Sequence, residues 1–315
     1  MDAQKIKTDK LIPDFPEFVD LDIKYKNLLQ EIASRFSTYS DFNFVSLFNW
    51  NNDGQIKISK LNENLVVRFI DYTTKNSFYS FIGDNELVET INALIDHSVA
   101  EGKEPELILV PEEAVKELSA DTEHNLELVE DNDNHDYILS VEDLVEFRTN
   151  KYRGKKNLHN RFVRHYGEDS IAKELDLSNA QAIEEIRGVT KKWQEARNKS
   201  DEETSLEFEA INRCLDNADN LGIRVFGIYI KGELQAYTIF EILPGEVAML
   251  HFDKANTQFE GIFENLKHNF AKHLHSFDIK TINFQQDLGI PGLRQSKMSY
   301  QPIDYLRKYK IRRLN

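Results

Sequence analysis

The fold and the candidate site are both decided by the stretch from Ile282 to Pro302, which reads INFQQDLGIPGLRQSKMSYQP. It begins as a short strand and then breaks into carboxamides, one carboxylate and glycines. Gly289, Pro291 and Gly292 predict a tight loop, because glycine permits positive φ and proline fixes φ. Arg294 and Lys297 follow three positions apart and would point the same way on a helical turn. The stretch predicts either polar groups presented to a ligand or a solvated turn between core elements.

Upstream of this stretch, the sequence predicts an antiparallel meander followed by a helix. The strands are expected at Ile223–Ile230, Leu234–Leu243 and Val247–Phe252. Lys231-Gly232 and Pro244-Gly245 are short enough for hairpin turns between them. A helix from Phe259 to about His275 then leads to the strand at 280–284.

The N-terminal half has a similar order of elements. Strand-like runs at Asn43–Trp50 and Ile56–Leu61 flank Asn52-Asp53-Gly54, a strong hairpin signal. Further strands are expected at 66–72 and 77–82, then a helix at 86–100 and a strand at 106–110. Each half therefore runs from a meander through a helix to a strand. The sequence predicts an α+β fold with domains at 1–140 and 141–315, in keeping with a length of 315 residues.

Composition excludes several classes of protein. No apolar run approaches the roughly 20 residues of a membrane span, and Met1–Lys5 lacks the apolar core of a signal peptide. The single cysteine, Cys214, permits no internal disulfide and fits a reducing compartment. We therefore expect a cytoplasmic protein. No Cys/His constellation has zinc spacing, so no metal site is predicted.

Charge is distributed unevenly along the chain. The net charge is −15, which argues against wholesale nucleic-acid binding. Nevertheless, the run from Arg148 to His165 contains seven Lys/Arg and no acid. Such a run suits phosphate groups, as in tRNA, a phospholipid head or a nucleotide-linked precursor. The alternative is an exposed basic connector.

Three segments carry a resemblance to a known family. They read KKNLHNRF at 155–162, HFDKA at 251–255 with Gly261, and DLGIPGLR at 287–294 continuing through Lys297 to Tyr300. Together they resemble soluble relatives of the phosphatidylglycerol lysyltransferase C-terminal domain. The resemblance covers the C-terminal half well and the N-terminal half in outline. It implies two tandem GNAT-like domains with mixed, mostly antiparallel sheets, distantly similar to Fem-type aminoacyl transferases.

The chain departs from this family at one position of the candidate site. The family usually has a glutamate two residues after the strand asparagine, and here that position is Gln285. A carboxylate role cannot be carried over to it.

The resemblance also implies a region where coenzyme A would bind, at the start of the helix after the meander. A helix N-terminus and nearby glycines would hold the pyrophosphate there. Gln258 and Gly261 keep two positions of the GNAT pattern, but Phe263 replaces its small third residue and Glu260 would repel phosphate. A coenzyme A thioester is thus a possible cofactor, and aminoacyl-tRNA is the preferred donor.

Four residues are candidates for the chemistry. His251 is either a general base or a buried structural histidine. Lys254 is a cation that would stabilise the developing oxyanion, because the family keeps a lysine at this position. Asp287 is a base, a partner that orients Arg294, or a cap on the Gly289 loop. Tyr300 is a proton donor or a packing residue. The candidate substrate and phosphate ligands are Lys155, Lys156, Asn160, Arg161, Gln285, Arg294 and Lys297.

These observations predict a transferase that moves an aminoacyl or acyl group from an activated donor to an amine or hydroxyl acceptor. The acceptor would be a small molecule or a lipid head group. The alternative is a binding protein for a phosphate-containing ligand in which the chemistry has lapsed, as Gln285 and Phe263 suggest.

Overall fold

The computed structural model describes residues 11–71, 74–116, 118, 125–147, 150–196 and 202–314. Parts of the sequence interpretation lie outside these residues, namely Met1–Lys5, the predicted strand end Tyr72, and Arg148 in the basic run.

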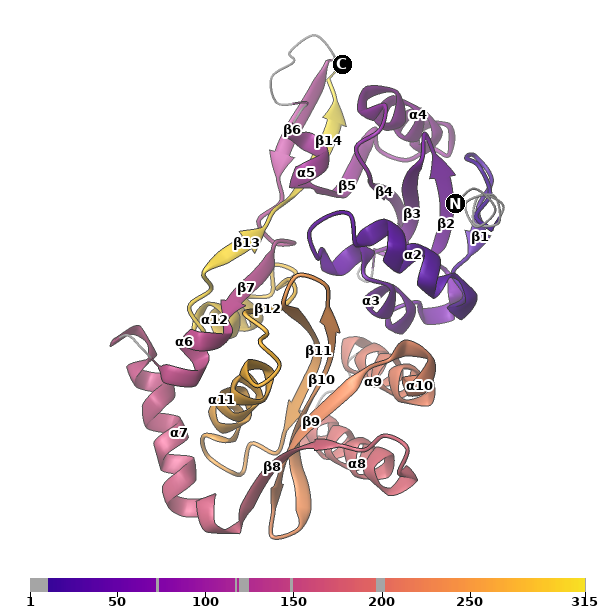
Figure 1. Ribbon diagram of the computed structural model, residues 1–315. Coiled ribbons are helices and arrows are strands. Elements are labelled where there is room, and N and C mark those ends of the chain that lie inside the picture. Colours follow the sequence, from indigo (N-terminus) through magenta and orange to yellow (C-terminus); the bar gives the residue numbers. More distant parts are fainter. Residues whose placement is uncertain are drawn as a thin grey trace. The chain divides into compact units, whose positions relative to one another are not determined.

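The chain forms two compact units, which we describe separately (Figure 1). Unit 1 comprises residues 1–136 and 306–315, and unit 2 comprises residues 137–305. The C-terminal residues therefore group with unit 1, whereas the sequence analysis assigned all of 141–315 to the second domain.

Unit 1 contains two sheets and several short helices. The first sheet has the order β1 (Val19–Asp20), β2 (Lys57–Leu61), β3 (Asn64–Ile70), β4 (Ser77–Ile82), and the second has the order β5 (Glu106–Pro111), β14 (Lys308–Arg313), β6 (Leu126–Glu130). The helices are α2 (Lys26–Ala33), α3 (Phe44–Asn49), α4 (Leu87–Ala100) and α5 (Glu112–Val115), with 3-10 turns η1 (Ile23–Tyr25), η2 (Ser40–Phe42) and η3 (Asn52–Gly54).

The predicted strand at Asn43–Trp50 is wrong, because these residues form helix α3. The side chain of Asn43 caps the helix by accepting a hydrogen bond from the Ser46 backbone N–H, at 2.9 Å. Phe44, Val45 and Leu47 are all buried, so packing overrides the β preference of these residues. The hairpin predicted through Asn52-Asp53-Gly54 is absent for the same reason, and β2 pairs with β3 instead.

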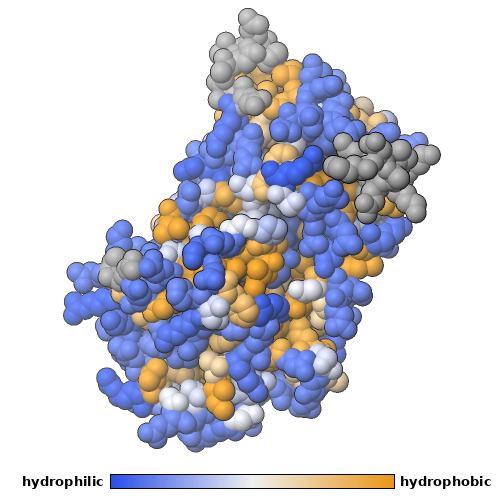
Figure 2. Space-filling model, in the orientation of Figure 1, coloured by the Kyte–Doolittle hydropathy of each residue, from blue (hydrophilic) through white to orange (hydrophobic). Residues whose placement is uncertain are grey.

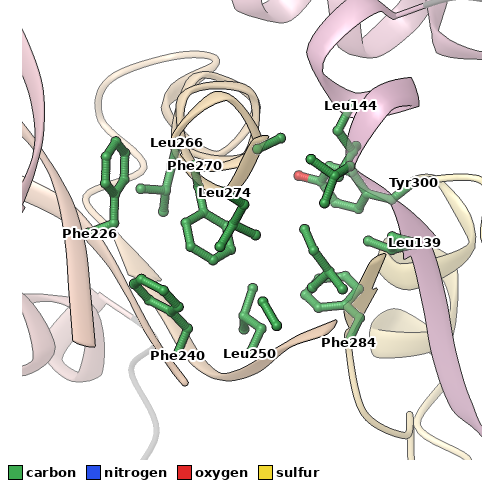
Figure 3. Packing of buried hydrophobic residues seen from close by; sticks show 14 of the residues in the cluster. Leu139, Leu144, Phe226, Phe240, Leu250, Leu266, Phe270, Leu274, Phe284 and Tyr300 are labelled. Carbon is green, nitrogen blue, oxygen red and sulfur yellow. The ribbon is translucent and has the colours of Figure 1, made fainter. Parts of the chain in front are cut away.

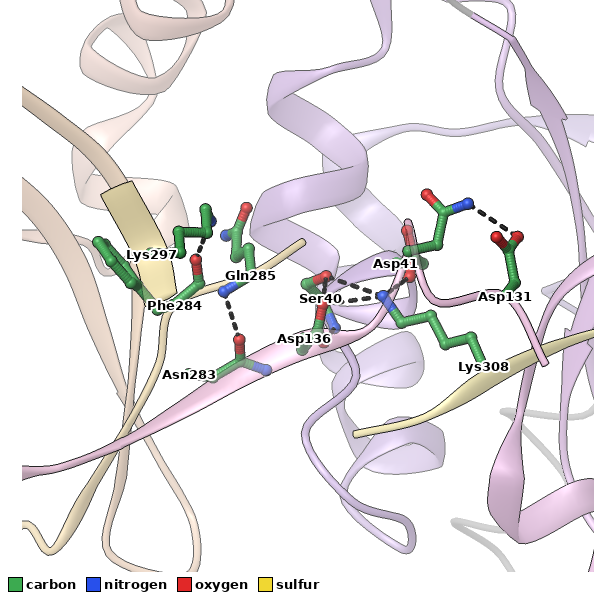
Figure 4. A network of polar contacts seen from close by, with 10 residues as sticks. Ser40, Asp41, Asp131, Asp136, Asn283, Phe284, Gln285, Lys297 and Lys308 are labelled. Carbon is green, nitrogen blue, oxygen red and sulfur yellow. Dashed lines mark hydrogen bonds and ion pairs between the residues drawn. The ribbon is translucent and has the colours of Figure 1, made fainter. Parts of the chain in front are cut away.

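A buried ion cluster ties the C-terminal strand into unit 1 (Figure 4). The Lys308 ammonium donates to Asp136 Oδ1 at 2.8 Å and also pairs with Asp41. Ser40 donates to the same Asp136 carboxylate through its backbone N–H (2.7 Å) and its hydroxyl (2.6 Å). Burial alone would lower the pKa of Lys308, but the two carboxylates outweigh burial and raise it. The cluster therefore holds three charges that depend on one another.

Unit 2 is built on one seven-stranded sheet. Its order is β13 (Asp304–Leu306), β7 (Asp136–Ser140), β12 (Thr281–Asn283), β11 (Val247–Ala255), β10 (Glu233–Leu243), β9 (Arg224–Ile230), β8 (Ser170–Leu175). Its helices and turns are α6 (Val141–Glu146), η6 (Asn150–Tyr152), α7 (Arg153–Tyr166), η7 (Gly167–Asp169), α8 (Ala180–Ala196), α9 (Glu202–Asp216), α10 (Ala218–Leu221), α11 (Ile262–His275) and α12 (Pro291–Met298).

The meander β9–β10–β11 is antiparallel, as its short turns predicted, and β12 then pairs parallel with β11. Helix α11 covers one face of this sheet and α8 lies against the other (Figure 1). The α+β class with mostly antiparallel sheets is confirmed. Both units have the order expected of a GNAT-like fold, an antiparallel meander, a helix and a further strand.

The main core of unit 2 lies between the sheet and α11 (Figure 3). Phe270 and Leu274 of α11 pack onto Phe240 and Leu250 of the sheet. The same cluster continues to Tyr300, which Figure 3 shows beside Leu144 and Phe284. Because this core is continuous, it holds β11, the end of β12 and the segment that follows α12 in fixed positions.

We expect Lys308→Met to lower the free energy of unfolding by about 3–5 kcal/mol, since the variant leaves buried Asp136 and Asp41 without their cation. Lys310→Met on the same strand removes a more exposed lysine, which lies 3.8 Å from Asp131, and should cost less than about 1 kcal/mol. Urea unfolding of both variants measures the difference. Equal losses in the two variants would contradict the buried cluster.

Candidate active site

The candidate site lies where β11 and β12 part. Their parallel pairing runs only from Val247↔Thr281 to Met249↔Asn283. Nearby, the register between β10 and β11 shifts, so that Ile239 faces Phe252 and Phe240 faces Leu250. His251 lies between these pairs as the extra residue of a β-bulge, and bulges commonly re-aim a side chain next to a site.

Three side chains form a hydrogen-bonded chain at this bulge. His251 Nε2 lies 3.1 Å from Glu241 Oε1, and His251 Nδ1 lies 3.2 Å from Gln285 Nε2. A carboxylate only accepts, so Nε2 carries the proton and Nδ1 accepts from the Gln285 amide. The side chains of His251 and Glu241 are 1% and 5% exposed. The imidazole is thus held in one tautomer in a buried setting.

Gln285 occupies a backbone conformation that few non-glycine residues adopt. Its φ is 58°, in the left-handed region. Its N–H donates to Asn283 Oδ1 at 2.7 Å (Figure 4), and its carbonyl accepts from the Tyr137 N–H at 3.2 Å. These bonds end strand β12 and aim the Gln285 amide at His251.

Asp287 is the centre of the loop that follows. Its carboxylate, which is fully buried, accepts from Arg294 Nε and NH2, both at 2.8 Å, from the Gly289 N–H at 2.8 Å, and from the Tyr137 hydroxyl. Burial, the largest influence, disfavours the charged carboxylate, but these hydrogen bonds outweigh burial and keep the pKa of Asp287 below its ordinary value. Of the roles left open by the sequence, this geometry favours orienting Arg294 and capping the loop over acting as a base.

Lys297 and Lys155 point into unit 2, although the sequence suggested that both bind phosphate. The Lys297 ammonium donates to the Phe284 carbonyl, and its nitrogen lies 4.7 Å from the centre of the Phe284 ring. Lys155 pairs with Glu264 at 3.1 Å and lies 3.9 Å from the centre of the Tyr300 ring. Both lysines therefore brace the loop and helix α12 from inside.

Tyr300 belongs to the hydrophobic core of unit 2. Its carbonyl accepts from the Tyr152 hydroxyl at 2.9 Å. Burial, with a smaller effect of Glu264, raises the pKa of the Tyr300 hydroxyl. The packing role is the one that the geometry favours.

Lys254 lies on the face of the sheet that carries α8 and α9. Its ammonium is 2.5 Å from Glu207 Oε1 of α9 and 4.0 Å from the ring centre of Trp193 of α8. Lys254 pairs across the strands with Tyr237, and alternate residues of β10 share a face, so Lys254 and Glu241 lie on the same face of the sheet.

Helix α7 carries the basic run. Lys156, Asn160 and Arg161 are exposed, and Arg161 pairs with Glu260. Arg153, Lys156 and Arg164 have no ion pair with any described residue. Figure 2 shows a mainly hydrophilic surface over this helix. The exposed part of α7 is thus the cationic surface of unit 2 that a phosphate-bearing ligand can reach.

Gly261 is explained by helix packing. It is the N-cap of α11 with φ 81°, and a Cβ at this position would lie 2.2 Å from the Leu158 carbonyl oxygen of α7. Gln258 is exposed, and its N–H donates to Asn256 Oδ1. The glycine therefore gives no support of its own to a coenzyme A site.

Two histidines meet where α6, α7 and α11 come together. The rings of His159 and His268 are 4.3 Å apart, and His268 Nδ1 lies 3.0 Å from the Leu144 carbonyl, to which it donates. Burial, with smaller effects of His268 and Lys272, lowers the pKa of His159 to about 4. Burial lowers the pKa of His268 as well, so both imidazoles are neutral in the folded protein at neutral pH.

Glu241, Asn283 and Tyr137 belong to the site but were missed in the sequence. Glu241 had a signal, because it is a lone acid in the apolar strand at 234–243. Tyr137 and Asn283 gave no sequence signal other than being polar residues on strands. In the described part of the chain, no three His, Cys, Asp or Glu residues are grouped to hold a metal ion, and no helix there is long and apolar enough to cross a bilayer.

Known proteins resemble the chain over most of its length. Residues 34–312 match the family model described as phosphatidylglycerol lysyltransferase, C-terminal. A protein of unknown function from Bacteroides thetaiotaomicron is 25% identical, with a TM-score of 0.81 over 94% of this chain and 98% of that chain.

Two further structures share the fold. L-PGS from Bacillus licheniformis is 15% identical, with a TM-score of 0.61 over 97% of this chain and 95% of that one. A DUF2156 domain from Agrobacterium fabrum is 12% identical, with a TM-score of 0.63 over 93% and 92%. No curated protein is significantly similar in sequence.

We expect Gly261→Ala to lower the free energy of unfolding by at least about 2 kcal/mol, because the methyl group would clash with the α7 backbone at a positive φ. Gly188→Ala, in helix α8 with open space around it, should instead stabilise by about 0.5–1 kcal/mol. Chemical denaturation compares the two. A neutral effect of Gly261→Ala would show that α7 does not pack against this glycine.

The protein should lose stability as the pH falls from about 6.5 to 4, partly through His159. In this window the unfolded chain binds a proton at His159 that the folded protein does not, so folding weakens with acid. Carboxylates titrate here as well, so the measurement is the difference between the wild type and His159→Gln. The melting temperature of the variant should fall less steeply over this window, and parallel curves would refute the contribution of His159.

Proposed function

Because the chain belongs to the phosphatidylglycerol lysyltransferase C-terminal family, we propose that it transfers an aminoacyl group from an activated donor to an amine or hydroxyl acceptor. The family supports a transferase, and the donor we favour is aminoacyl-tRNA. The packing of α7 against Gly261, together with Phe263 at the next-but-one position, favours this donor over acyl-coenzyme A.

The observation that carries the proposal is the chain Glu241–His251–Gln285 at the divergent ends of β11 and β12. A buried imidazole with a carboxylate on Nε2 is arranged to take a proton at Nδ1, since the carboxylate stabilises the imidazolium that forms. The Gln285 amide, which occupies Nδ1 in this structure, must swing away when the acceptor binds. The Gln285 side chain has three rotatable bonds and lies at the end of a strand, so it can make that movement.

The reaction then proceeds in two steps. The acceptor nitrogen or oxygen attacks the donor's ester carbonyl while its proton passes to His251 Nδ1. The tetrahedral oxyanion collapses, the carbon–oxygen bond to the tRNA ribose breaks, and the leaving ribose oxygen takes from His251 the proton that came from the acceptor. Lys254 lies on the same sheet face as Glu241 and is our candidate to stabilise the oxyanion, exchanging Glu207 for the substrate.

The donor's phosphates would bind along α7. Lys156, Asn160 and Arg161 are exposed there, and a tRNA backbone contacted by several cations would bind with a steep salt dependence. Arg294, which is partly exposed and held by Asp287, would contact the acceptor or the donor's terminal phosphate. Lys155 and Lys297 would support these groups from within the core.

A second function is favoured by Gln285, which stands where the family usually has glutamate. A protein with this change could keep the cleft and bind a phosphate-containing ligand without turning it over. Binding and turnover separate the two functions.

We expect His251→Asn to lower kcat by roughly 10²–10⁴-fold with little change in donor affinity, because the proton acceptor is lost while the phosphate contacts remain. Glu241→Gln should reduce kcat less and shift its pH profile. The assay follows loss of labelled amino acid from a panel of charged tRNAs in the presence of amines, hydroxyl compounds and phosphatidylglycerol vesicles. His275→Asn, an exposed histidine at the end of α11, is the matched control.

The outcomes discriminate between the transferase and the binding protein. Turnover of acetyl-coenzyme A in place of charged tRNA would overturn the donor assignment. Tight binding of charged tRNA without turnover by any acceptor would favour the binding protein. Full activity in His251→Asn would remove His251 from the mechanism.

A further inference from the structure

The seven-stranded sheet of unit 2 ends in two edge strands of different kinds. At one end lies β13, which has three residues and begins with the exposed Asp304. At the other end lies β8, whose six residues pair with β9 alone and without a bulge (Figure 1). Proteins usually keep an edge strand from pairing with another chain by shortening, charging, bulging or covering it. The edge of β8 is neither short nor bulged, and it contains no proline.

The side chains of β8 leave this edge uncovered. Ile171 is 62% exposed, the highest value among the large apolar side chains of the described residues. Ala172 and Lys173 are exposed as well. Lys173 is the one cation of the strand, but its ammonium lies 4.5 Å from the centre of the Tyr229 ring. Its side chain therefore reaches over β9, away from the open edge, and does not block a second strand.

The hydrogen-bond ladder shows which backbone groups of β8 point outward. The Lys231 N–H donates to the Asp169 carbonyl at 2.8 Å, and Ser170 lies opposite Ile230. Asp169 and Lys231 are therefore a hydrogen-bonded pair, and such pairs alternate with non-bonded ones along an antiparallel ladder. The even-numbered residues of β8 thus turn their N–H and C=O groups away from β9.

Two of these outward N–H groups lack an acceptor. The Ser170 N–H donates to the Gly167 carbonyl, which closes η7. The N–H groups of Ala172 and Glu174 make no hydrogen bond with any described residue. The outward carbonyls of Ser170 and Ala172 lie on the same edge, so donors and acceptors follow one another along it.

We propose that two copies of this chain pair through β8, antiparallel about a two-fold axis at Ala172, so that their sheets become one. The Ala172 N–H of each copy donates to the Ala172 carbonyl of the other, and the Glu174 N–H donates to the Ser170 carbonyl of the other. A continuous sheet keeps each side chain on its own face, so the axis must pass through an outward-turned residue. An axis at Glu174 would bring two carboxylates together, and one at Ser170 would pair little of the strand. Ala172 places only methyl groups on the axis.

The side chains of β8 are complementary to themselves in this register. Ile171 lies opposite Lys173 of the second copy. On the same face, the diagonal neighbours toward the N-terminal ends of the two strands are Ile171 with Ile171, and Lys173 with Asp169. The right-handed twist of strands brings these diagonals closer together. Asp169 is 54% exposed, so an apolar contact at the axis is flanked by two pairs of opposite charge. This match favours a second copy as the partner of β8.

Sedimentation equilibrium of the full chain from about 1 to 300 µM tests the dimer without any substrate. The mass should rise from 36.7 kDa toward twice that value, with a dissociation constant on the order of 10–100 µM, because pairing one strand gives a small interface. Ala172→Pro removes an N–H that the ladder to β9 does not use, so the variant should fold and dimerise at least roughly tenfold more weakly. Ile171→Lys leaves the backbone intact and places like charges across the axis, with the same expected loss.

The matched control is Val99→Lys, which changes a valine of α4 in unit 1 that is 50% exposed. It should dimerise as the wild type does, and melting temperatures verify the folding of every variant. The register is tested by Ala172→Cys, because Cα atoms of a hydrogen-bonded pair lie about 5.5 Å apart, within the range of a disulfide. Mild oxidation should link Ala172→Cys into covalent dimers, whereas Val99→Cys should stay a single chain. The natural Cys214 is buried.

Three results would overturn the proposal. The first is a wild-type mass of one chain at about 300 µM, which would leave the open edge to a strand of another protein. The second is dimerisation of wild-type strength in both Ala172→Pro and Ile171→Lys. The third is a dimer in which Ala172→Cys forms no disulfide, since the copies would then meet through another surface.

Discussion

The candidate site depends on one buried carboxylate, that of Asp287. It joins strand β7, through Tyr137, which is 150 residues away in sequence, to the loop through Gly289 and to helix α12 through Arg294. A carboxylate without water is costly unless donors surround it, and here they do. Because all of these donors must be in place together, the loop after β12 has one conformation. That conformation sets where Gln285 and Lys297 lie on either side of it.

The chemistry-bearing groups lie where regular structure is interrupted. A continuous β11 would alternate its side chains and keep His251 out of reach of Glu241, whereas the bulge brings the two within 3.1 Å. Likewise, the positive φ of Gln285 ends β12 and turns its amide toward His251. Two local departures from ideal geometry, each held by hydrogen bonds, create one buried chain of polar groups. The rigid meander and α11 fix the frame around them.

Local signals predicted the meander of unit 2, because Lys231-Gly232 and Pro244-Gly245 favour tight turns between adjacent strands. They failed at Asn43–Trp50, where tertiary packing decides between helix and strand. The sequence predicted the candidate site only in part. His251 and Gln285 lie together, but Lys254 pairs with Glu207, and Lys155 and Lys297 point inward. Those outcomes depend on partners such as Glu264, which is 109 residues from Lys155 in sequence. No local pattern reports such a pairing, nor the bulge that brings Glu241 to His251.

The proposed tRNA donor would bind through the cations of unit 2, so the position of α7 determines how its phosphates are contacted. The 14 residues of α7 span about 21 Å. The N-terminal end meets α12 through Tyr152 and Lys155, while the C-terminal half meets the start of α11 through Arg161 and Glu260. The two ends are farther apart than a screening length of about 8–10 Å at physiological salt. Polyanions bound at opposite ends would therefore repel each other only weakly. The two ends of this basic helix can thus contact separate phosphate groups of the proposed donor.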